Sequence, residues 1–524
     1  MAERRTRKTV DAAVSSPQLD QAPSSAVEPV VFGMPRSLWP YAALILFAGL
    51  SAGVFCWYVI VTHGHPTPSA SNAILLVLSL AGAAFALAAW YWYARWISAK
   101  YDVEAGAMLK ADAWSYLPLV GLWLYVFELP PSLAAASTLV GSLLLVCLAI
   151  KIAAVARYIP MVRHVATAFV ATRLPLIIIA PLSAIVIGQR QGQHWSASRG
   201  LLLDVWGRWD AQHYLTIATN GYQGKEMAFF PLYPYLVHLL GGLIGDHLIA
   251  ALVISNLAFF VALCYLYALV KLEFGDESIA FHAIFYTAIF PTAIFFSAVY
   301  TESLFLALTV ASVYYARHGN YITSGIFGAL ASMTRVEGML TAIPLAYEAW
   351  HGWRERGGTA LTRGAIGVAL VPMGLLAYMG YLYALVGDPL FFLKIQDNWN
   401  RHLAPPWVSI VNTIKEIQSN PLASGGTVNH IIELVFTLAF LILVIVAFKK
   451  LRLSYALYFA ASLLMPMCTA SLMSMPRFVL VMFPAFMLMA VWGRNPVVNS
   501  AIVSLSLPLL GLFTVLFADW YWLA

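Results

Sequence analysis

The sequence is dominated by apolar runs of about 20 residues, separated by short polar connections. Such runs cover roughly 40–62, 73–95, 112–129, 132–154 and 164–188, and they resume between 248 and 518. This is the length that an α-helix needs to cross the hydrocarbon core of a bilayer. The runs lack the period-2 alternation of transmembrane strands. The sequence therefore predicts an all-α polytopic membrane protein.

The amino-acid composition supports this class of protein and gives no support for nucleic acid or a metal ion as a partner. Hydrophobic residues make up 61% of the 524 residues and charged residues only 10%, too few polar groups to cover a soluble domain of this size. The net charge of +6 gives no support for nucleic-acid binding, because most Lys and Arg lie in short loops where they set membrane orientation. The four cysteines fall inside apolar runs without metal-ligand spacing, which indicates neither a zinc site nor a disulfide framework.

Four regions follow from the distribution of polar residues. Residues 1–38 are rich in Ser, Ala and Pro and begin with basic residues, which predicts a disordered cytoplasmic tail. No apolar segment of a cleaved signal peptide follows closely. Residues 39–160 form an accessory module of four spans, 161–495 form the core, and 496–524 carry a last span. We expect an inner (plasma) membrane protein with a cytoplasmic N-terminus.

One stretch between the spans, 203–235, concentrates ionisable and aromatic side chains. On a helical reading Asp210, His213 and Tyr214 lie at i, i+3 and i+4, so a carboxylate and an imidazole share one face. Trp209 and its neighbours are typical of a membrane interface. The alternative is an interfacial connector whose charges are simply solvated. Asp204, six residues before Asp210, is a second candidate carboxylate.

The segment 229–245 decides the topology downstream. It is apolar but has only 17 residues, with two prolines and three glycines, so we expect it to lie in the outer interface. Nine later cations then lie inside and five outside, and a crossing segment reverses these numbers. The inside set is Lys271, Arg317, Arg354, Arg356, Arg363, Lys449, Lys450, Arg452 and Arg494; the outside set is Arg335, Lys394, Arg401, Lys415 and Arg477.

This topology gathers polar span ends on the external face. Cations on the face that the positive-inside rule disfavours indicate an anionic ligand such as a phosphate. Each residue also has a simpler explanation. Glu302 is placed to stabilise a helix N-terminus, Arg335 to pair with Glu302 or Glu337, and Asp388 to form a turn in VGDPL.

The motifs in this region resemble a known family. RWDAQHYLTIATNGY and AFFPLYP, then FPTAIFFSAVYTESLFLALTVASVYYA, GIFGALASMTRVEGML and SMPRFVLVMFPAF, are similar in content and order to the PIG-V family of glycosylphosphatidylinositol mannosyltransferases. GDPLFFLKIQDNWNRHLAPPW suggests its prokaryotic branch. The resemblance covers about 164–492. Thr301 stands where the family commonly has Ser, and Val336–Gly338 replaces a common Asn-Gly pair.

The resemblance implies a GT-C glycosyltransferase with a large first external loop that carries interfacial helices and an essential acid. Such an enzyme takes mannose from a polyprenyl-phosphate donor, with inversion, and passes it to a lipid-linked or glycan acceptor on the non-cytoplasmic face. We expect no cofactor or metal. Asp210 is the expected general base, with Glu302, His213 and Asp204 as further catalytic candidates. The substrate-binding candidates are Arg335, Arg401, Arg477, Lys394, Trp209, Tyr214, Tyr300 and Trp399.

Two other classes remain open. A lipid or solute transporter predicts inverted repeats and charges near mid-span, whereas here the charges gather at span ends and no repeat is evident. A non-catalytic scaffold would use the N-terminal spans to recruit a partner. The sequence leaves the acceptor and the identity of the sugar undetermined.

Overall fold

A computed structural model describes residues 30–31, 34–63, 70–125, 133–188, 200–399, 401–421 and 424–522. Within these ranges the secondary structure is helical, apart from a pair of two-residue antiparallel strands, β1 (Val30–Val31) and β2 (Met34–Pro35). Six helices in the described part of the chain are long and apolar enough to cross a membrane. The prediction of an all-α polytopic membrane protein is confirmed. The predicted tail, 1–38, lies mostly outside the described residues.

The N-terminal helices surround a small core of their own. Trp90, Met108 and Leu109 are buried there. Asp112 forms an ion pair with Lys151, with 2.8 Å between Oδ1 and Nζ. The predicted span at 112–129 is interrupted by a short 3₁₀ turn. The elements are η1 (Arg36–Leu38), α1 (Trp39–His63), α2 (Ala70–Tyr101), α3 (Ala105–Ala113), η2 (Trp114–Tyr116), α4 (Leu117–Tyr125) and α5 (Leu133–Tyr158).

The next helix, α6 (Pro160–Val186), joins these helices to the larger bundle, because it packs against α5, α10, α11 and α23. Arg173 of α6 is buried and donates to the carbonyl oxygens of Ala288 and Ala293 and to Ser297 Oγ. The carbonyl of Ala288 lies in the last turn of α11, where carbonyl groups have no partner within the helix. Arg173 therefore ties α6 to α11 and to the segment around η4 inside the bundle.

The larger bundle is built from helices of unequal length. Small residues allow close approach between α13 and α15, since a Cβ on Gly325 would lie 2.3 Å from the carbonyl oxygen of Gly367. Its elements are α10 (His247–Phe274), α11 (Glu277–Ile289), η4 (Ala293–Phe296), α12 (Glu302–Arg317), α13 (Tyr321–Thr334), η5 (Val336–Thr341), α14 (Ala342–Arg356), α15 (Gly358–Leu370), α16 (Met373–Val386), α19 (Gly425–Lys450), α20 (Leu453–Met467), α21 (Met475–Val479), α22 (Phe483–Trp492) and α23 (Pro496–Ala518).

The helices α13 and α14 form a short hairpin, with η5 in the turn between them. α13 has 14 residues, about 21 Å, which is less than the ~30 Å of the hydrocarbon core. Gly338 in the turn lies against the backbone of Ala331 and Ser332, so close that a Cβ there would lie 2.2 Å from a backbone atom. This tight turn carries Arg335 and Glu337 into the bundle.

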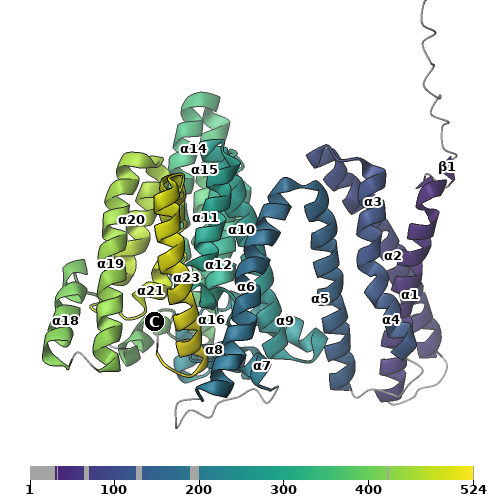
Figure 1. Ribbon diagram of the computed structural model, residues 1–524, viewed down its shortest axis with the longest axis horizontal. Helices are drawn as coiled ribbons and strands as arrows, with labels where there is room; N and C mark the ends of the chain where they lie inside the picture. The colour runs from purple at the N-terminus through teal and green to yellow at the C-terminus, as the bar shows by residue number, and fades with distance from the viewer. Residues whose placement is uncertain are drawn as a thin grey trace, which may run out of the picture.

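The remaining short elements gather toward the end of the bundle opposite the α14–α15 connection (Figure 1). The segment 229–245 forms α9, whose 13 residues span about 20 Å, which is short for a membrane crossing. These elements are α7 (Leu201–Asp204), α8 (Ala211–Asn220), η3 (Gly224–Ala228), α9 (Leu232–Ile244), α17 (Phe391–Lys394), η6 (Ile395–Trp399) and α18 (Pro406–Ser419).

The α14–α15 end is held by a separate ionic network. The carboxylate of Glu348, 5% exposed, accepts from Arg452 Nε at 2.7 Å and from Ser454 Oγ at 2.8 Å. Arg317 lies 3.5 Å from the same carboxylate and pairs with Glu273 at 2.9 Å. Each carboxylate of this network is paired with an arginine, and the contacts tie α10, α12, α14 and α20 together.

Candidate active site

A chain of alternating charges connects four separate parts of the sequence. Asp210 Oδ2 lies 2.6 Å from Arg477 Nη1, and Arg477 Nε lies 3.3 Å from Glu302 Oε1. The same Oε1 accepts from Arg335 Nη1 at 2.9 Å, and Arg335 Nη2 lies 3.3 Å from Glu337 Oε1. The structure therefore brings together the acid of the Trp-Asp-Ala motif, the acid of α12 and two of the candidate cations.

The backbone around Asp210 presents its carboxylate to this chain. Asp210 is at the N-cap of α8, yet its side chain makes no capping hydrogen bond and turns to Arg477 instead. Its backbone N–H donates to Tyr300 Oη at 3.2 Å, and that hydroxyl donates to the carbonyl of Arg208 at 3.1 Å. Tyr300, a substrate-binding candidate, is thus a fully buried support of the Asp210 turn.

One carboxylate oxygen of Asp210 stays open. In the part of the chain that the structure describes, hydrogen bonds reach Asp210 through Oδ2 and the backbone, and none reaches Oδ1. The side chain is 16% exposed. Geometry of this kind leaves Oδ1 able to accept a proton from an incoming group.

Glu302 occupies the helix N-terminus that the sequence predicts for it and also pairs with two cations. It is the first residue of α12, where a carboxylate interacts favourably with the helix dipole, and it also bridges Arg335 and Arg477. Its side chain is 1% exposed. Its second oxygen, Oε2, and the hydroxyl of the neighbouring Thr301 are buried and have no hydrogen-bond partner among the residues that the structure describes.

The cations of the site differ in their partners. Burial by itself lowers the pKa of Arg477, but the nearby carboxylates of Asp210 and Glu302 have the larger combined effect. The pKa of Arg477 is therefore raised above its usual value. Burial, and secondly the positive charge of Arg477, lower the pKa of Arg401 to about 10. Arg401 donates to the carbonyl of Met473 at 2.8 Å and forms no carboxylate ion pair among the described residues.

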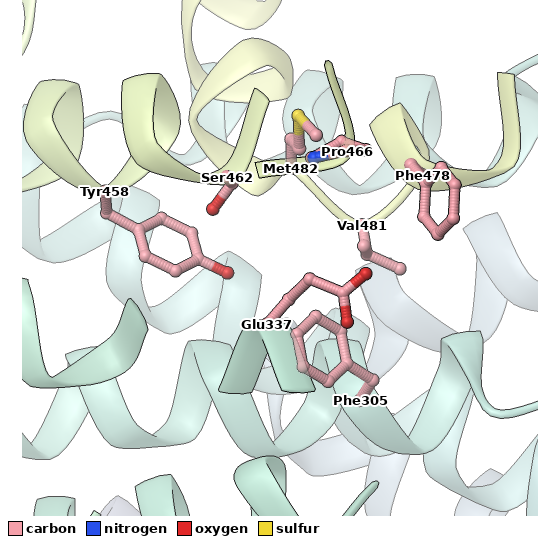
Figure 2. A pocket seen from close by; sticks show the side chains of 8 residues that line it. All are labelled: Phe305, Glu337, Tyr458, Ser462, Pro466, Phe478, Val481 and Met482. Carbon is pink, nitrogen blue, oxygen red and sulfur yellow. The ribbon is translucent and has the colours of Figure 1, made fainter. Parts of the chain in front are cut away.

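Aromatic rings cover the guanidinium groups. The Phe478 ring centroid lies 5.2 Å from Arg335 and from Arg401, and Phe305 lies 5.6 Å from Arg335. Such contacts suit desolvated guanidinium groups. Both rings also line a small cavity that Glu337 faces (Figure 2). Its volume of about 10 Å³, measured as the space open to the centre of a water molecule, holds about one water.

A second group of rings extends from the Asp210 turn. Tyr214 contacts Tyr300 at 6.3 Å and Phe229 at 5.1 Å between centroids, and Trp399 lies 6.1 Å from Phe229. His213 stacks on Phe229 at 4.7 Å, and its Nδ1 lies 3.2 Å from Glu226 Oε1. The imidazole is therefore held by Glu226, and of the roles considered for His213 the structure shows a structural contact.

Three candidates lie outside the charge chain. Lys394 is 71% exposed and pairs with Asp388 at 2.6 Å. Asp204 is buried at the end of α7, away from the hydrogen bonds of Asp210. Trp209 packs edge-on against Trp520 at 5.6 Å and Trp522 at 5.1 Å, so its ring is committed to the protein.

Sequence reasoning missed part of the site. It considered Glu337 only as a structural partner of Arg335, and it treated the segment after α23 as the end of a span. That segment, Ala518–Trp522, contacts Arg208 and Trp209. The signal available was the run Asp-Trp-Tyr-Trp directly after an apolar helix, polar and aromatic enough to indicate more than a simple helix end.

The fold and the charge chain define a helical membrane protein with a carboxylate–guanidinium site at the ends of its helices. Residues 191–396 match the family model described as Mannosyltransferase (PIG-V), and this match identifies the segment with that family and confirms the resemblance. The matched segment contains Asp210, Glu302, Arg335 and Glu337. Arg401 and Arg477 lie beyond it.

A curated relative agrees with this family. The chain is 30% identical over 151 residues to GPI alpha-1,6-mannosyltransferase 2 of Cricetulus griseus. The matched stretch covers 27% of this chain and 31% of that relative, so it spans about a third of the relative's length. No solved structure matches the chain.

Proposed function

We propose that this protein is a membrane mannosyltransferase that takes mannose from a polyprenyl-phosphate donor and passes it to the hydroxyl of a lipid-linked or glycan acceptor. The observation that carries the proposal is the pairing of Asp210 with Arg477, inside a charge chain that includes Glu302 and Arg335. Four of the five members of this chain, all except Arg477, lie in the segment matched to the mannosyltransferase family. A GT-C-type bundle of the prokaryotic branch is part of the same proposal.

In this mechanism Asp210 is the general base. The acceptor oxygen attacks the anomeric carbon while its proton passes to Oδ1 of Asp210, and the bond between that carbon and the phosphate oxygen breaks. The phosphate leaves with the electron pair on the face opposite the attack, so the configuration inverts without a covalent sugar intermediate. The open position of Oδ1 supports this role.

Arg401 is the first contact that we assign to the donor phosphate. Arg335 and Arg477 are already neutralised by carboxylates, whereas Arg401 has no carboxylate ion pair among the described residues. Arg477 can then exchange Asp210 for a phosphate oxygen, which stabilises the leaving group and frees the base. Tyr214 and Trp399 remain candidates for contacts with the sugar ring.

We infer that the site faces away from the cytoplasm. Arg354 lies in the last turn of α14. The helices α8, which begins directly after Asp210, and α21, which contains Arg477, lie toward the other end of the bundle (Figure 1). By the positive-inside rule the α14–α15 end belongs in the cytoplasm, which favours an external site and an N-terminus on the cytoplasmic side of the inner membrane. An interfacial α9 agrees with this orientation. The four-span accessory role of 39–160 stays a prediction.

Purified full-length protein supplied with radiolabelled polyprenyl-phosphate mannose and a membrane glycolipid extract tests the proposal. Label transfer to acceptor that is abolished in Asp210→Asn supports an enzyme. Label that crosses the membrane of sealed proteoliposomes without chemical change supports the transporter. If the label is neither transferred nor transported, the scaffold is supported.

Metal independence is tested in the same assay. We expect activity to survive exhaustive chelation, since no group of three or more His, Cys, Asp or Glu in the described ranges is arranged to hold an ion. Activity that is lost on chelation and restored by a divalent ion contradicts this prediction.

A further inference from the structure

Both partners of the central ion pair follow strained backbone positions. Trp209, directly before Asp210, has φ of 58°, and Ser474, three residues before Arg477, has φ of 68°. A residue other than glycine is unfavourable in this left-handed region, so its surroundings must hold it there. The contacts that hold these two turns therefore determine where Asp210 and Arg477 meet.

The Trp209 turn is held by the segment that follows α23. Arg208 Nε donates to the carbonyl of Ala518 at 3.3 Å, and its guanidinium lies 4.7 Å from the Trp520 ring. Trp209 packs between the rings of Trp520 and Trp522, at 65° and 84°. The carbonyl of Trp522 in turn accepts from Asn429 Nδ2 at 3.2 Å.

The Ser474 turn is held by the same helix as Trp522. The backbone N–H of Ser474 donates to Glu433 Oε1 at 3.2 Å, and Glu433 is 3% exposed. The other carboxylate oxygen of Glu433 contacts His430 Nδ1 at 3.1 Å. Asn429 and Glu433 are four residues apart on α19, so they lie on one face of that helix.

We propose that Asn429 and Glu433 of α19 are positioning residues that set the Asp210–Arg477 pair from both sides. Asn429 acts on Asp210 through Trp522 and Trp209, and Glu433 acts on Arg477 through Ser474. One helix thereby fixes the relative position of two side chains that are 267 residues apart in sequence. The inference rests on the proposed function for its effect on catalysis, but its geometric part stands separately.

The test compares Asn429→Ala and Glu433→Leu with two matched variants. Leu approximates the size of Glu but cannot accept from Ser474, whereas Glu433→Gln keeps an acceptor oxygen at the same place. Val435→Ala, on the same helix but 56% exposed, is the control for substitutions in α19. All variants are purified as full-length protein.

Two measurements are made on each variant: kcat and KM with polyprenyl-phosphate mannose, and hydrogen exchange by mass spectrometry. We expect kcat to fall 10- to 100-fold in Asn429→Ala and Glu433→Leu with KM within about twofold, because small misplacement of reacting groups costs this much. Exchange should accelerate at 206–214 in Asn429→Ala and at 472–480 in Glu433→Leu. Glu433→Gln and Val435→Ala should resemble the wild type.

Three results overturn the inference. They are unchanged kcat and exchange in both variants, faster exchange throughout the bundle including 302–317, and failure of Glu433→Gln to restore kcat. A wild-type protein without transferase activity contradicts the proposed function instead. In that case local exchange at the two turns still decides whether α19 positions them.

Discussion

Asp210→Asn separates the chemical role of this carboxylate from its structural role. The asparagine amide keeps an oxygen that can accept from Arg477, at nearly the same size, but it cannot take a proton from an acceptor hydroxyl. The charge chain contains three carboxylates and two guanidinium groups, so loss of the Asp210 charge leaves two ions of each sign. Arg477 also retains Glu302 at 3.3 Å.

The expected magnitudes follow from this geometry. Loss of a general base lowers the rate 10²- to 10⁴-fold, equivalent to about 2.7–5.4 kcal/mol in the barrier. The loss of stability should stay below the 3–5 kcal/mol that is typical when a buried ion loses its only partner, because neither guanidinium becomes unpaired. The variant should therefore fold and bind donor, yet transfer very slowly.

The assay is single-turnover transfer from radiolabelled polyprenyl-phosphate mannose in nanodiscs, with thermal unfolding of the same preparation. The control is Glu277→Gln, which breaks an ion pair with Lys271 whose members are about half exposed; exposed pairs contribute little, so transfer should match the wild type. An Asp210→Asn rate above one tenth of the wild-type rate, with normal unfolding, refutes Asp210 as the base.

Three further predictions concern the cations and the opposite end of the bundle. Arg477→Met should cost about 3–5 kcal/mol of stability in thermal unfolding and abolish transfer, because Asp210 then lacks a cation and Glu302 keeps only Arg335. Glu348→Leu should destabilise by a similar amount, but kcat per folded molecule should stay within twofold, which rules out a site role. KM for donor should rise as pH passes 10, where Arg401 loses its charge, and Arg401→Gln should lack this step.

The tight hairpin between α13 and α14 illustrates the limit of sequence reasoning. The apolar runs between 248 and 518 include 321–335 and 338–350, which predict two spans, and helices are present there, at Tyr321–Thr334 and Ala342–Arg356. Their lengths fall short of a bilayer crossing, and the turn between them enters the bundle because Gly338 approaches the α13 backbone. The hydropathy of a segment shows that it is apolar, but it does not show how far a turn at its end enters the helical bundle.

The sequence by itself determined the membrane class, the approximate helices and the family of the matched segment, and it selected Asp210, Glu302 and Arg335 as candidate site residues. These properties depend on local composition or on ordered motifs, which are visible along the chain. Only the tertiary structure decided the partners: His213 with Glu226, Lys394 with Asp388, and Asp210 with Arg477. An ion pair forms where the folded chain brings two opposite charges within reach, and for Asp210 and Arg477 that depends on how helices far apart in sequence come together.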